Sequence, residues 1–352
     1  MAGPLSAAGL GAFIWLGLGA LIPDRAPDSL EHLAARKDST FVRFLAVGDV
    51  NLGRVVGQRI LEGDTLYPFA EIRDDLASFD FVFGNLECQL SDQHGETQHP
   101  TSNLIFTGPP AGAAALSHGG ITHVSTANNH ALDYGVGALQ ETIDNLEREG
   151  IVFAGTAAAG GDPFAPALFE AGELSFALFS VTEIINIEVR SWTDYVAKAD
   201  SAQLFPRIRA MRPIVDFILI SYHGGGEYVD RPTAGTRAFA HGALEAGADL
   251  FLGHHPHVPQ GIEEVNGKLI VYSLGNFVFS QPFAFWTQRS FALEVKIRKE
   301  GKAAHIESYR CLPLIASNQP SLLRHTGDRR IVHERIEHLS ELFGGRGYVW
   351  PN

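Results

Sequence analysis

From Phe41 onward, short apolar runs alternate with segments whose apolar residues recur at helical spacing. Short apolar runs bounded by Gly, Pro or polar residues are typical of buried strands. This pattern predicts strands at 41–47, 79–84, 121–127, 151–155, 175–181, 215–221 and 248–253. It predicts helices at 55–61, 68–79, 135–149 and 233–246, and a helix of small residues after Pro110, whereas the stretch between 181 and 215 is irregular.

The pattern changes near the C-terminal end of this region. Residues 262–265 and 268–272 flank Asn266-Gly267, a dipeptide that favours a two-residue hairpin turn. Residues 291–299 and 303–311 predict a second antiparallel pair. Alternation of strands and helices places helices on both faces of a buried sheet, and the late hairpins make the sheets mixed. We therefore predict an α/β layered sandwich of mixed β-sheets flanked by helices.

The chain divides into four segments. Residues 1–23 contain no charged side chain and are long enough to cross a membrane as a helix. They have three interpretations, namely an uncleaved membrane anchor, a cleaved signal peptide, and a misassigned start or buried helix. Residues 24–40 are polar and form a linker, 41–315 form the α/β domain, and 316–352 form a polar tail with a peripheral helix.

Composition narrows the class of protein. The 352 residues include 27 Lys and Arg against 40 Asp and Glu, a formal net charge of −13. This acidity argues against nonspecific nucleic-acid binding, which needs a basic surface. The only two cysteines, Cys88 and Cys311, are too few for a disulfide scaffold or a thiolate zinc site.

Compact polar clusters follow six of the predicted strands. Ligands of open α/β sheets bind outside the carboxyl ends of the strands, so clusters far apart in sequence can form one site. Each cluster alone has an ordinary explanation, such as a turn or a helix cap, and it is their joint occurrence at strand ends that favours a site. The clusters span 48–54, 84–87, 128–135, 223–228, 253–257 and 273–276.

The side chains in these clusters favour a divalent metal site. Oxygen and nitrogen ligands of the kind that such ions prefer are carried by Asp49, Glu87, Asn129, His223, His255 and His257. We expect Glu87 to bridge two ions and His130 to donate a proton to a leaving oxygen. Arg54 is suited to hold an anionic oxygen. The full set of expected substrate-contacting residues is Asn51, Arg54, Asn85, His254, Glu227, Tyr228 and Asn276.

Together these motifs resemble those of the CapA family of capsule and poly-γ-glutamate synthesis proteins, a branch of the calcineurin-like metallophosphatase fold. The resemblance covers about residues 41–315, and its motifs occur in the family order. It implies a metallophosphatase-like sandwich, often attached to the outer face of the membrane. The matching motifs are GDVNLGR (48–54), GNLE (84–87), NNHALDYG (128–135), HGGGEY (223–228), GHHPHVPQ (253–260) and SLGNF (273–277).

The resemblance also implies roles for single residues. Asp49 matches the metal ligand of the first phosphatase motif, and Glu87 takes the place of its bridging aspartate. The Asn129-His130 pair matches a ligand and its neighbouring proton donor, while the remaining matched ligands are His223, His255 and His257. Two features depart from the phosphatases: Asn51 stands where they have His, and the bridge is Glu instead of Asp. Both departures resemble the CapA branch. A third departure is Gly225, which stands where the family often has Trp.

Three functions are compatible with this sequence. The first is an extracytoplasmic, membrane-associated protein of capsule or poly-γ-glutamate synthesis or export, which predicts an anionic polymer and other synthesis proteins as partners. The second is a metal-dependent phosphoesterase acting on nucleotides or other phosphate esters. The third is a non-enzymatic assembly protein with a relic site. For the first two we expect one or two divalent ions, such as Mn, Fe, Zn or Mg.

Overall fold

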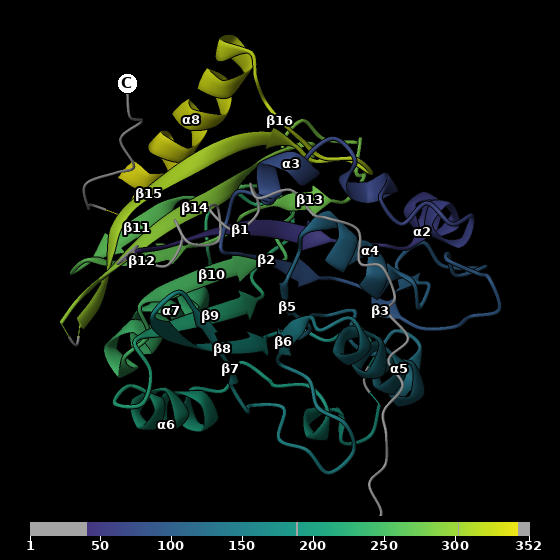
Figure 1. Cartoon of the computed structure of the whole chain (residues 1–352), viewed down its shortest axis with the longest axis horizontal. Coiled ribbons are helices and arrows are strands. Elements are labelled where there is room, and N and C mark those ends of the chain that lie inside the picture. The colour runs from purple at the N-terminus through teal and green to yellow at the C-terminus, as the bar shows by residue number, and fades with distance from the viewer. Residues whose placement is uncertain (1–40, 188, 302, 344–352) are drawn as a thin grey trace, which may run out of the picture. The chain divides into compact units, whose positions relative to one another are not determined.

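The computed structural model describes residues 41–187, 189–301 and 303–343, so the predicted anchor (1–23) and linker (24–40) lie outside the described residues. Two large sheets form the centre of the molecule (Figure 1). The 8-stranded sheet runs in the order β16-β15-β14-β1-β2-β5-β6, with β13 paired to β1, and the 6-stranded sheet runs β11-β12-β10-β9-β8-β7. A 2-stranded sheet pairs β3 with β4.

The first sheet is parallel in its middle and antiparallel at one side. Strands β1, β2, β5, β6 and β13 are parallel neighbours, whereas β14, β15 and β16 pair antiparallel. The bounds are β1 (Phe41–Val50), β2 (Phe81–Leu86), β5 (His123–Ser125), β6 (Val152–Ala154), β13 (Asn276–Val278), β14 (Arg289–Glu300), β15 (Ala303–Ile315) and β16 (Ser321–Leu322).

The second sheet is also mixed. Strands β8, β9, β10 and β12 are parallel, and β7 and β11 pair antiparallel at its two edges. The bounds are β7 (Ala167–Ala171), β8 (Leu174–Thr182), β9 (Phe217–His223), β10 (Leu250–His254), β11 (Ile262–Val265) and β12 (Lys268–Val271), with β3 (Gln89–Leu90) and β4 (Thr107–Gly108) in the small sheet. The predicted α/β sandwich with mixed sheets is confirmed.

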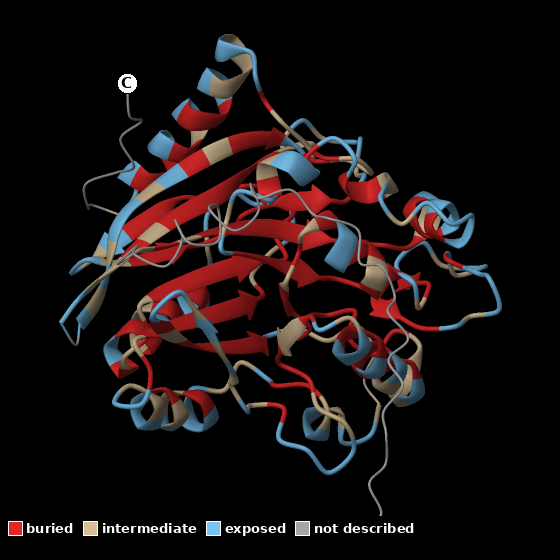
Figure 2. Ribbon diagram, in the orientation of Figure 1, coloured by how far each residue is buried: buried red, intermediate tan, exposed pale blue. Residues whose placement is uncertain are grey.

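The central strands of both sheets consist almost entirely of buried residues (Figure 2). Their buried side chains form layers between and outside the sheets. Alternate residues of β1 point to opposite faces, as its pleat requires. Phe44 packs with Phe176 and Phe217 of the second sheet, whereas Leu45 packs on the helices that cover the outer face. The helices on that face are α2 (Arg54–Leu61), α3 (Arg73–Leu76) and α4 (Gly112–Gly119), with the 3-10 turn η1 (Tyr67–Phe69).

Other helices cover the remaining surfaces. The outer face of the second sheet packs against α6 (Ser201–Met211) and α7 (Ala234–Ala246). Helix α5 (Gly135–Arg148) packs beside the turn η2 (Trp192–Asp194). Helix α8 (Thr326–Glu341) buries Val332 and Ile336 in the core between the sheets. No helix among the described residues is both long and apolar enough to span a bilayer.

Two local predictions were wrong. The segment 68–79, predicted as one helix, contains only η1 and the four-residue α3, because Pro68 lies in a tight 3-10 turn and Ile72 leaves the helical region with φ −130°. The irregular stretch between 181 and 215 contains helix α6, which is capped by Asp200: its carboxylate accepts the backbone N–H of Ala202 at 2.8 Å. Both cysteines are buried.

Candidate metal centre

The predicted metal ligands converge where strands of both sheets end. Asp49 lies at the end of β1, Glu87 directly follows β2, and His223 is the last residue of β9. His255 and His257 belong to the loop after β10. Because these strands run parallel within each sheet, residues distant in sequence meet at one edge, as the motif positions predicted.

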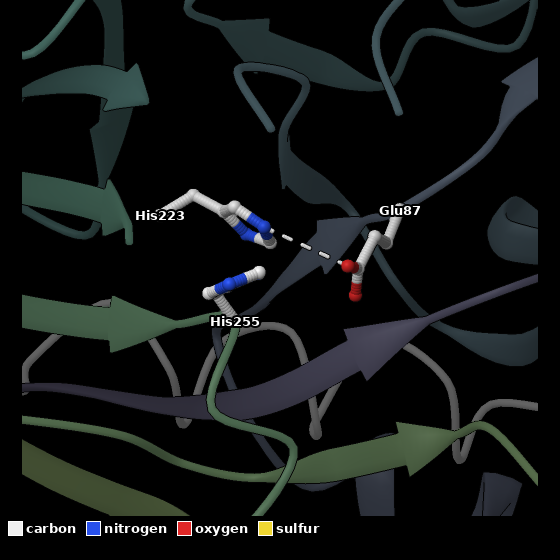
Figure 3. A group of neighbouring side chains, drawn as sticks. All are labelled: Glu87, His223 and His255. Atoms are coloured by element: carbon white, nitrogen blue, oxygen red, sulfur yellow. Dashed lines mark ion pairs between the residues drawn. The ribbon is translucent and has the colours of Figure 1, made fainter. Parts of the chain in front are cut away.

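Five of these side chains form two groups that could each hold a metal ion. One consists of Glu87, His223 and His255 (Figure 3), and the other of Asp49, Glu87 and His257. The candidate ligand atoms of each group lie within 4.8 Å of one another, and all five residues are buried. Glu87 belongs to both groups, which is the arrangement needed for a carboxylate that bridges two ions.

Glu87 is the most unusual group of the centre. Its residue is 0% exposed, and neither of its carboxylate oxygens has a hydrogen-bond partner among the described residues. Its nearest basic atoms are His223 Nε2 at 3.6 Å and His257 Nε2 at 3.9 Å, both measured to Oε1. A buried carboxylate without partners is costly, and such groups occur paired or bound to metals. A divalent cation between these atoms would satisfy it.

The two carboxylates of the centre have opposite pKa shifts. Burial, and then the neighbouring Asp49 carboxylate, raises the pKa of Glu87 well above its ordinary value. Burial also acts to raise the pKa of Asp49, but hydrogen bonds from His254 and His257 hold it well below the ordinary value. The protein alone thus favours one negative charge, and a cation would allow both carboxylates to ionise.

His223 and His255 are held in the neutral form, which is the form of imidazole that binds metals. Burial, and then the nearby His255, lowers the pKa of His223 well below its usual range. Burial, and then His257, lowers the pKa of His255 to about 4. His255 Nδ1 is buried without a hydrogen-bond partner among the described residues. Neutral imidazole carries the lone pair that a divalent ion accepts.

Amide side chains hold the ligands in place. Asn85 Nδ2 donates to Asp49 Oδ1 at 2.9 Å and lies 3.3 Å from His223 Nδ1. Asn129 Oδ1 lies 2.7 Å from His223 Nε2, which places this predicted ligand beside the first group. Asn128 Nδ2 donates to the Leu86 carbonyl at 2.7 Å and so fixes the Asn128–His130 loop to the end of β2. Asn85 is 0% exposed and lies behind the ligands.

The backbone around the ligands is tightly constrained. His255 and His257 have φ values of 97° and 58°, a region that costs about 1–3 kcal/mol per non-glycine residue. Gly48 allows β1 to approach the loop before β13 so closely that a Cβ atom there would lie 1.8 Å from the Gly275 carbonyl oxygen. This approach brings Asp49 into register with Asn276.

The predicted proton donor His130 has a carboxylate partner. His130 Nδ1 lies 2.6 Å from Asp133 Oδ2, and both side chains are buried. The same oxygen accepts the backbone N–H of Phe106 at 2.6 Å, and the Phe106 ring stacks on the imidazole with centroids 3.9 Å apart. With Nδ1 bonded to Asp133, Nε2 is the nitrogen that can give or take a proton. It lies 3.4 Å from Asn186 Nδ2.

Arg54 and Asn51 make contacts within the protein. The Arg54 guanidinium donates to the Asn103 carbonyl at 2.5 Å and lies 4.7 Å above the Phe106 ring. Burial lowers its pKa, although Tyr228 acts to raise it. Asn51 Oδ1 accepts the backbone N–H of Gly53 at 2.8 Å and shapes the turn into α2. Arg54 therefore borders the residues that hold His130.

The remaining predicted residues lie around the second metal group. His254 Nδ1 is 3.4 Å from Asp49 Oδ1, and Asn276 Oδ1 is 2.9 Å from His257 Nδ1. Glu227 and Tyr228 are exposed on the loop after β9. The Tyr228 ring is stacked near His257, with ring centroids 5.9 Å apart.

Several residues of the site were not predicted. Glu183 Oε2 accepts the backbone N–H of Gly225 at 3.0 Å, and Asn186 Oδ1 lies 3.3 Å from Asn129 Nδ2. Both residues follow strand β8, as the other clusters follow their strands. The position of the segment TEIIN (182–186) at a strand end could therefore have predicted them. Phe106 and Gln281 belong to loops, and no sequence pattern pointed to them.

The donor set of the centre fits a divalent ion. It consists of carboxylate oxygen and imidazole nitrogen with amide oxygen nearby, and Cys88 is not among the groups. Such ligands suit Mn, Fe, Zn and Mg. The partnerless oxygens of Glu87 are the observation that carries this fit.

Comparisons with known proteins agree with the motifs. The model of a family described as bacterial capsule synthesis protein PGA_cap matches residues 43–281. The PGA biosynthesis protein CapA of Bacillus subtilis is 29% identical over 261 residues, which cover 72% of this chain and 67% of the relative. The capsule biosynthesis protein CapA of Bacillus anthracis is 28% identical over 275 residues, with 73% of this chain and 64% of the relative covered.

The chain therefore spans about two thirds of the length of these two relatives. Among solved structures, a calcineurin-like phosphoesterase of Bacillus subtilis aligns with 86% of this chain and 99% of its own. The sequence identity is 13% and the TM-score is 0.46.

Proposed function

The chain belongs to the bacterial capsule synthesis protein PGA_cap family, and we propose that it serves the synthesis or export of a capsular polymer such as poly-γ-glutamate through a divalent-metal site. The resemblance to the CapA family is thereby confirmed. The polymer, its other synthesis proteins and the chemistry at the site are parts of the proposal.

One observation carries the metal-dependent part of this proposal. Glu87 is completely buried, has no hydrogen-bond partner among the described residues, and is shared by two groups of candidate ligands. A purely structural role would leave an unpaired buried carboxylate, which is destabilising. The first ion would be held by Glu87, His223 and His255, and the second by Asp49, Glu87 and His257.

When bound, divalent ions would lower the pKa of a coordinated water and polarise a phosphoryl or carbonyl oxygen. The chain's own residues would orient the reacting groups. Asn85 fixes Asp49 and His223 by its side-chain amide. Asp133 fixes the tautomer of His130 so that Nε2 can exchange a proton with the substrate.

The cellular part of the proposal places the domain outside the cytoplasmic membrane. The uncharged run at residues 1–23 supports an anchor or a signal segment there. Protease added to intact cells should then degrade the chain, while a cytoplasmic marker protein survives. Survival of the chain under those conditions would contradict the proposed location.

Genetic replacement tests the role in polymer synthesis. Removal of the gene should abolish the surface polymer of the source organism, and the wild-type chain should restore it. The isosteric Glu87→Gln variant should not restore it, whereas the exposed control His305→Ala should. Full restoration by Glu87→Gln would instead support an assembly protein with a relic site.

A second candidate function is a metal-dependent phosphoesterase, which the buried His130–Asp133 pair favours. Such a pair is suited to protonate the leaving oxygen of a phosphate ester. Turnover of bis(p-nitrophenyl) phosphate with Mn²⁺, abolished in His130→Ala, would support it. If the metal-loaded wild-type protein does not hydrolyse this ester, the proposed phosphoesterase activity on generic phosphodiesters is contradicted.

A further inference from the structure

A chain of side-chain hydrogen bonds connects the exposed residue Tyr228 with the candidate ligand His257. At the exposed end of this chain, Gln281 Nε2 donates to the Tyr228 hydroxyl at 3.3 Å. At its other end, Gln281 Oε1 accepts from Asn276 Nδ2 at 3.0 Å. Asn276 Oδ1 in turn lies 2.9 Å from His257 Nδ1. Gln281 is therefore two hydrogen bonds away from a metal ligand.

Two acceptors facing Asn276 Nδ2, Gln281 Oε1 and the Thr287 carbonyl oxygen, set the direction of this chain. Asn276 Nδ2 also donates to the Thr287 carbonyl oxygen at 2.9 Å, and a carbonyl can only accept. The amide group of Asn276 must therefore face Thr287 and Gln281 with its nitrogen, and His257 with its oxygen. Asn276 and Thr287 are both 0% exposed, so bulk water does not compete for these bonds.

This direction determines the tautomer of His257. Since Asn276 Oδ1 is an acceptor, His257 Nδ1 must carry the hydrogen. The second atom near Nδ1 is also an acceptor, because Asp49 Oδ2 lies 3.3 Å away. The lone pair of the neutral ring then resides on Nε2, which faces Glu87 Oε1 at 3.9 Å. Nε2 is thus the nitrogen presented to a cation.

Gln281 itself is held from two sides. Its backbone carbonyl accepts the Thr287 hydroxyl at 2.5 Å, and its side chain spans Asn276 and Tyr228. The Tyr228 ring packs near His257 and edge-on against Phe283, whose residue is 66% exposed. Gln281 consequently connects the exposed Tyr228 side chain with the group that orients His257.

We propose that Gln281 is a positioning residue, which holds Asn276 so that His257 presents Nε2 to the metal. This inference rests on the proposed metal site. Partners of this kind orient metal-binding histidines, and their loss typically weakens metal binding about 10–100-fold. Gln281 acts on His257 through Asn276.

The test compares variants that differ in one hydrogen-bonding group. Gln281→Ala and Gln281→Met both remove the oxygen that Asn276 needs, and Met also keeps the length of the side chain. Gln281→Glu keeps an oxygen facing Asn276. Gln288→Ala is the matched control, because Gln288 lies in the same loop and its side-chain amide donates to the carbonyls of Pro282 and Ala284.

Two measurements are made on the full chain. The ¹⁵N shifts of His257 in metal-free protein, assigned with His257→Ala, report its tautomer. Titration with Zn²⁺ reports the affinity of each variant for this ion. We expect an Nδ1–H tautomer in wild type, Gln281→Glu and Gln288→Ala. In Gln281→Ala and Gln281→Met, Asn276 loses one of the two acceptors that hold its amide. We therefore expect a changed His257 Nδ1 shift and about 10-fold or more weaker Zn²⁺ binding in these two variants.

Unchanged His257 shifts and wild-type affinity in Gln281→Met would overturn the inference. An equal loss of Zn²⁺ affinity in Gln288→Ala would also overturn it, because the loss would then come from a general disturbance of the loop. Wild-type protein that binds no Zn²⁺ would contradict the proposed metal site instead. In that case, the ¹⁵N shifts of His257 in the metal-free variants still decide the role of Gln281.

Discussion

The close approach between β1 and the loop before β13 should make Gly48 intolerant of even one methyl group. In Gly48→Ala the new Cβ atom would start 1.8 Å from the Gly275 carbonyl oxygen and 2.7 Å from its carbonyl carbon. Real Cβ contacts are longer than 3.0 Å, so buried backbone would have to move by at least 1.2 Å, the difference between 3.0 and 1.8 Å.

The cost follows from what this movement breaks. Overpacking in a dense core costs about 1–3 kcal/mol. The displacement also strains the hydrogen bond from the Asp49 N–H to the Gly275 carbonyl, worth about 1 kcal/mol. We therefore expect Gly48→Ala to lower the free energy of unfolding by about 3 kcal/mol. It should also lower metal content, because Asp49 and Asn276 would separate.

Gly137→Ala is the matched control. Gly137 lies in α5 with nothing within 4 Å of an added Cβ, so the same substitution should stabilise the protein by about 0.5 kcal/mol. Urea denaturation of the two variants, with elemental analysis of the same samples, measures both effects. A Gly48→Ala protein as stable as the wild type, or equal losses in both variants, would refute this reasoning.

Three further predictions concern groups whose pKa or partner the structure defines. Burial lowers the pKa of His123 to about 3, so the folded protein keeps this ring neutral while the unfolded chain protonates near pH 6.5. The free energy of unfolding should therefore fall as the pH drops below 6.5, and His123 should account for about 2 kcal/mol of the loss at pH 5. Urea titrations should show a smaller loss in His123→Leu, and an unchanged pH dependence in this variant would contradict the prediction. Asp133→Asn should reduce any phosphodiester turnover about 100-fold through His130 while metal content stays constant, and loss of the metal would argue against a role confined to proton transfer. Burial raises the pKa of Cys88 to about 12, so Ellman's reagent at pH 8 should label this thiol only after unfolding, and fast labelling of the native protein would contradict its burial.

Much of the fold could be predicted because its strands are buried on both faces. Segments such as 41–47 and 215–221 are continuous apolar runs, and each contains a buried strand of the structure. Helix α6 could not be predicted in the same way. Pro206 interrupts its pattern, and only Leu204 and Ile208 are buried, so the segment lacks a clear apolar face.

The candidate site was predictable where its residues follow strands. Asp49, Glu87 and His223 stand at strand ends, and parallel pairing brings such ends together. Gln281 was not predictable, because its contact with Tyr228 joins residues 53 positions apart through a loop that no local pattern specifies. Its position depends on tertiary packing around Thr287.

The metal content of the purified full chain tests the central claim most directly. Elemental analysis after dialysis against a weak chelator would compare wild type with Glu87→Gln, His257→Ala and the exposed control His305→Ala. We predict about one or two divalent transition-metal ions per chain in wild type and His305→Ala, and a loss in both other variants. Folded wild-type protein without metal, or variants that retain the full content, would contradict the account.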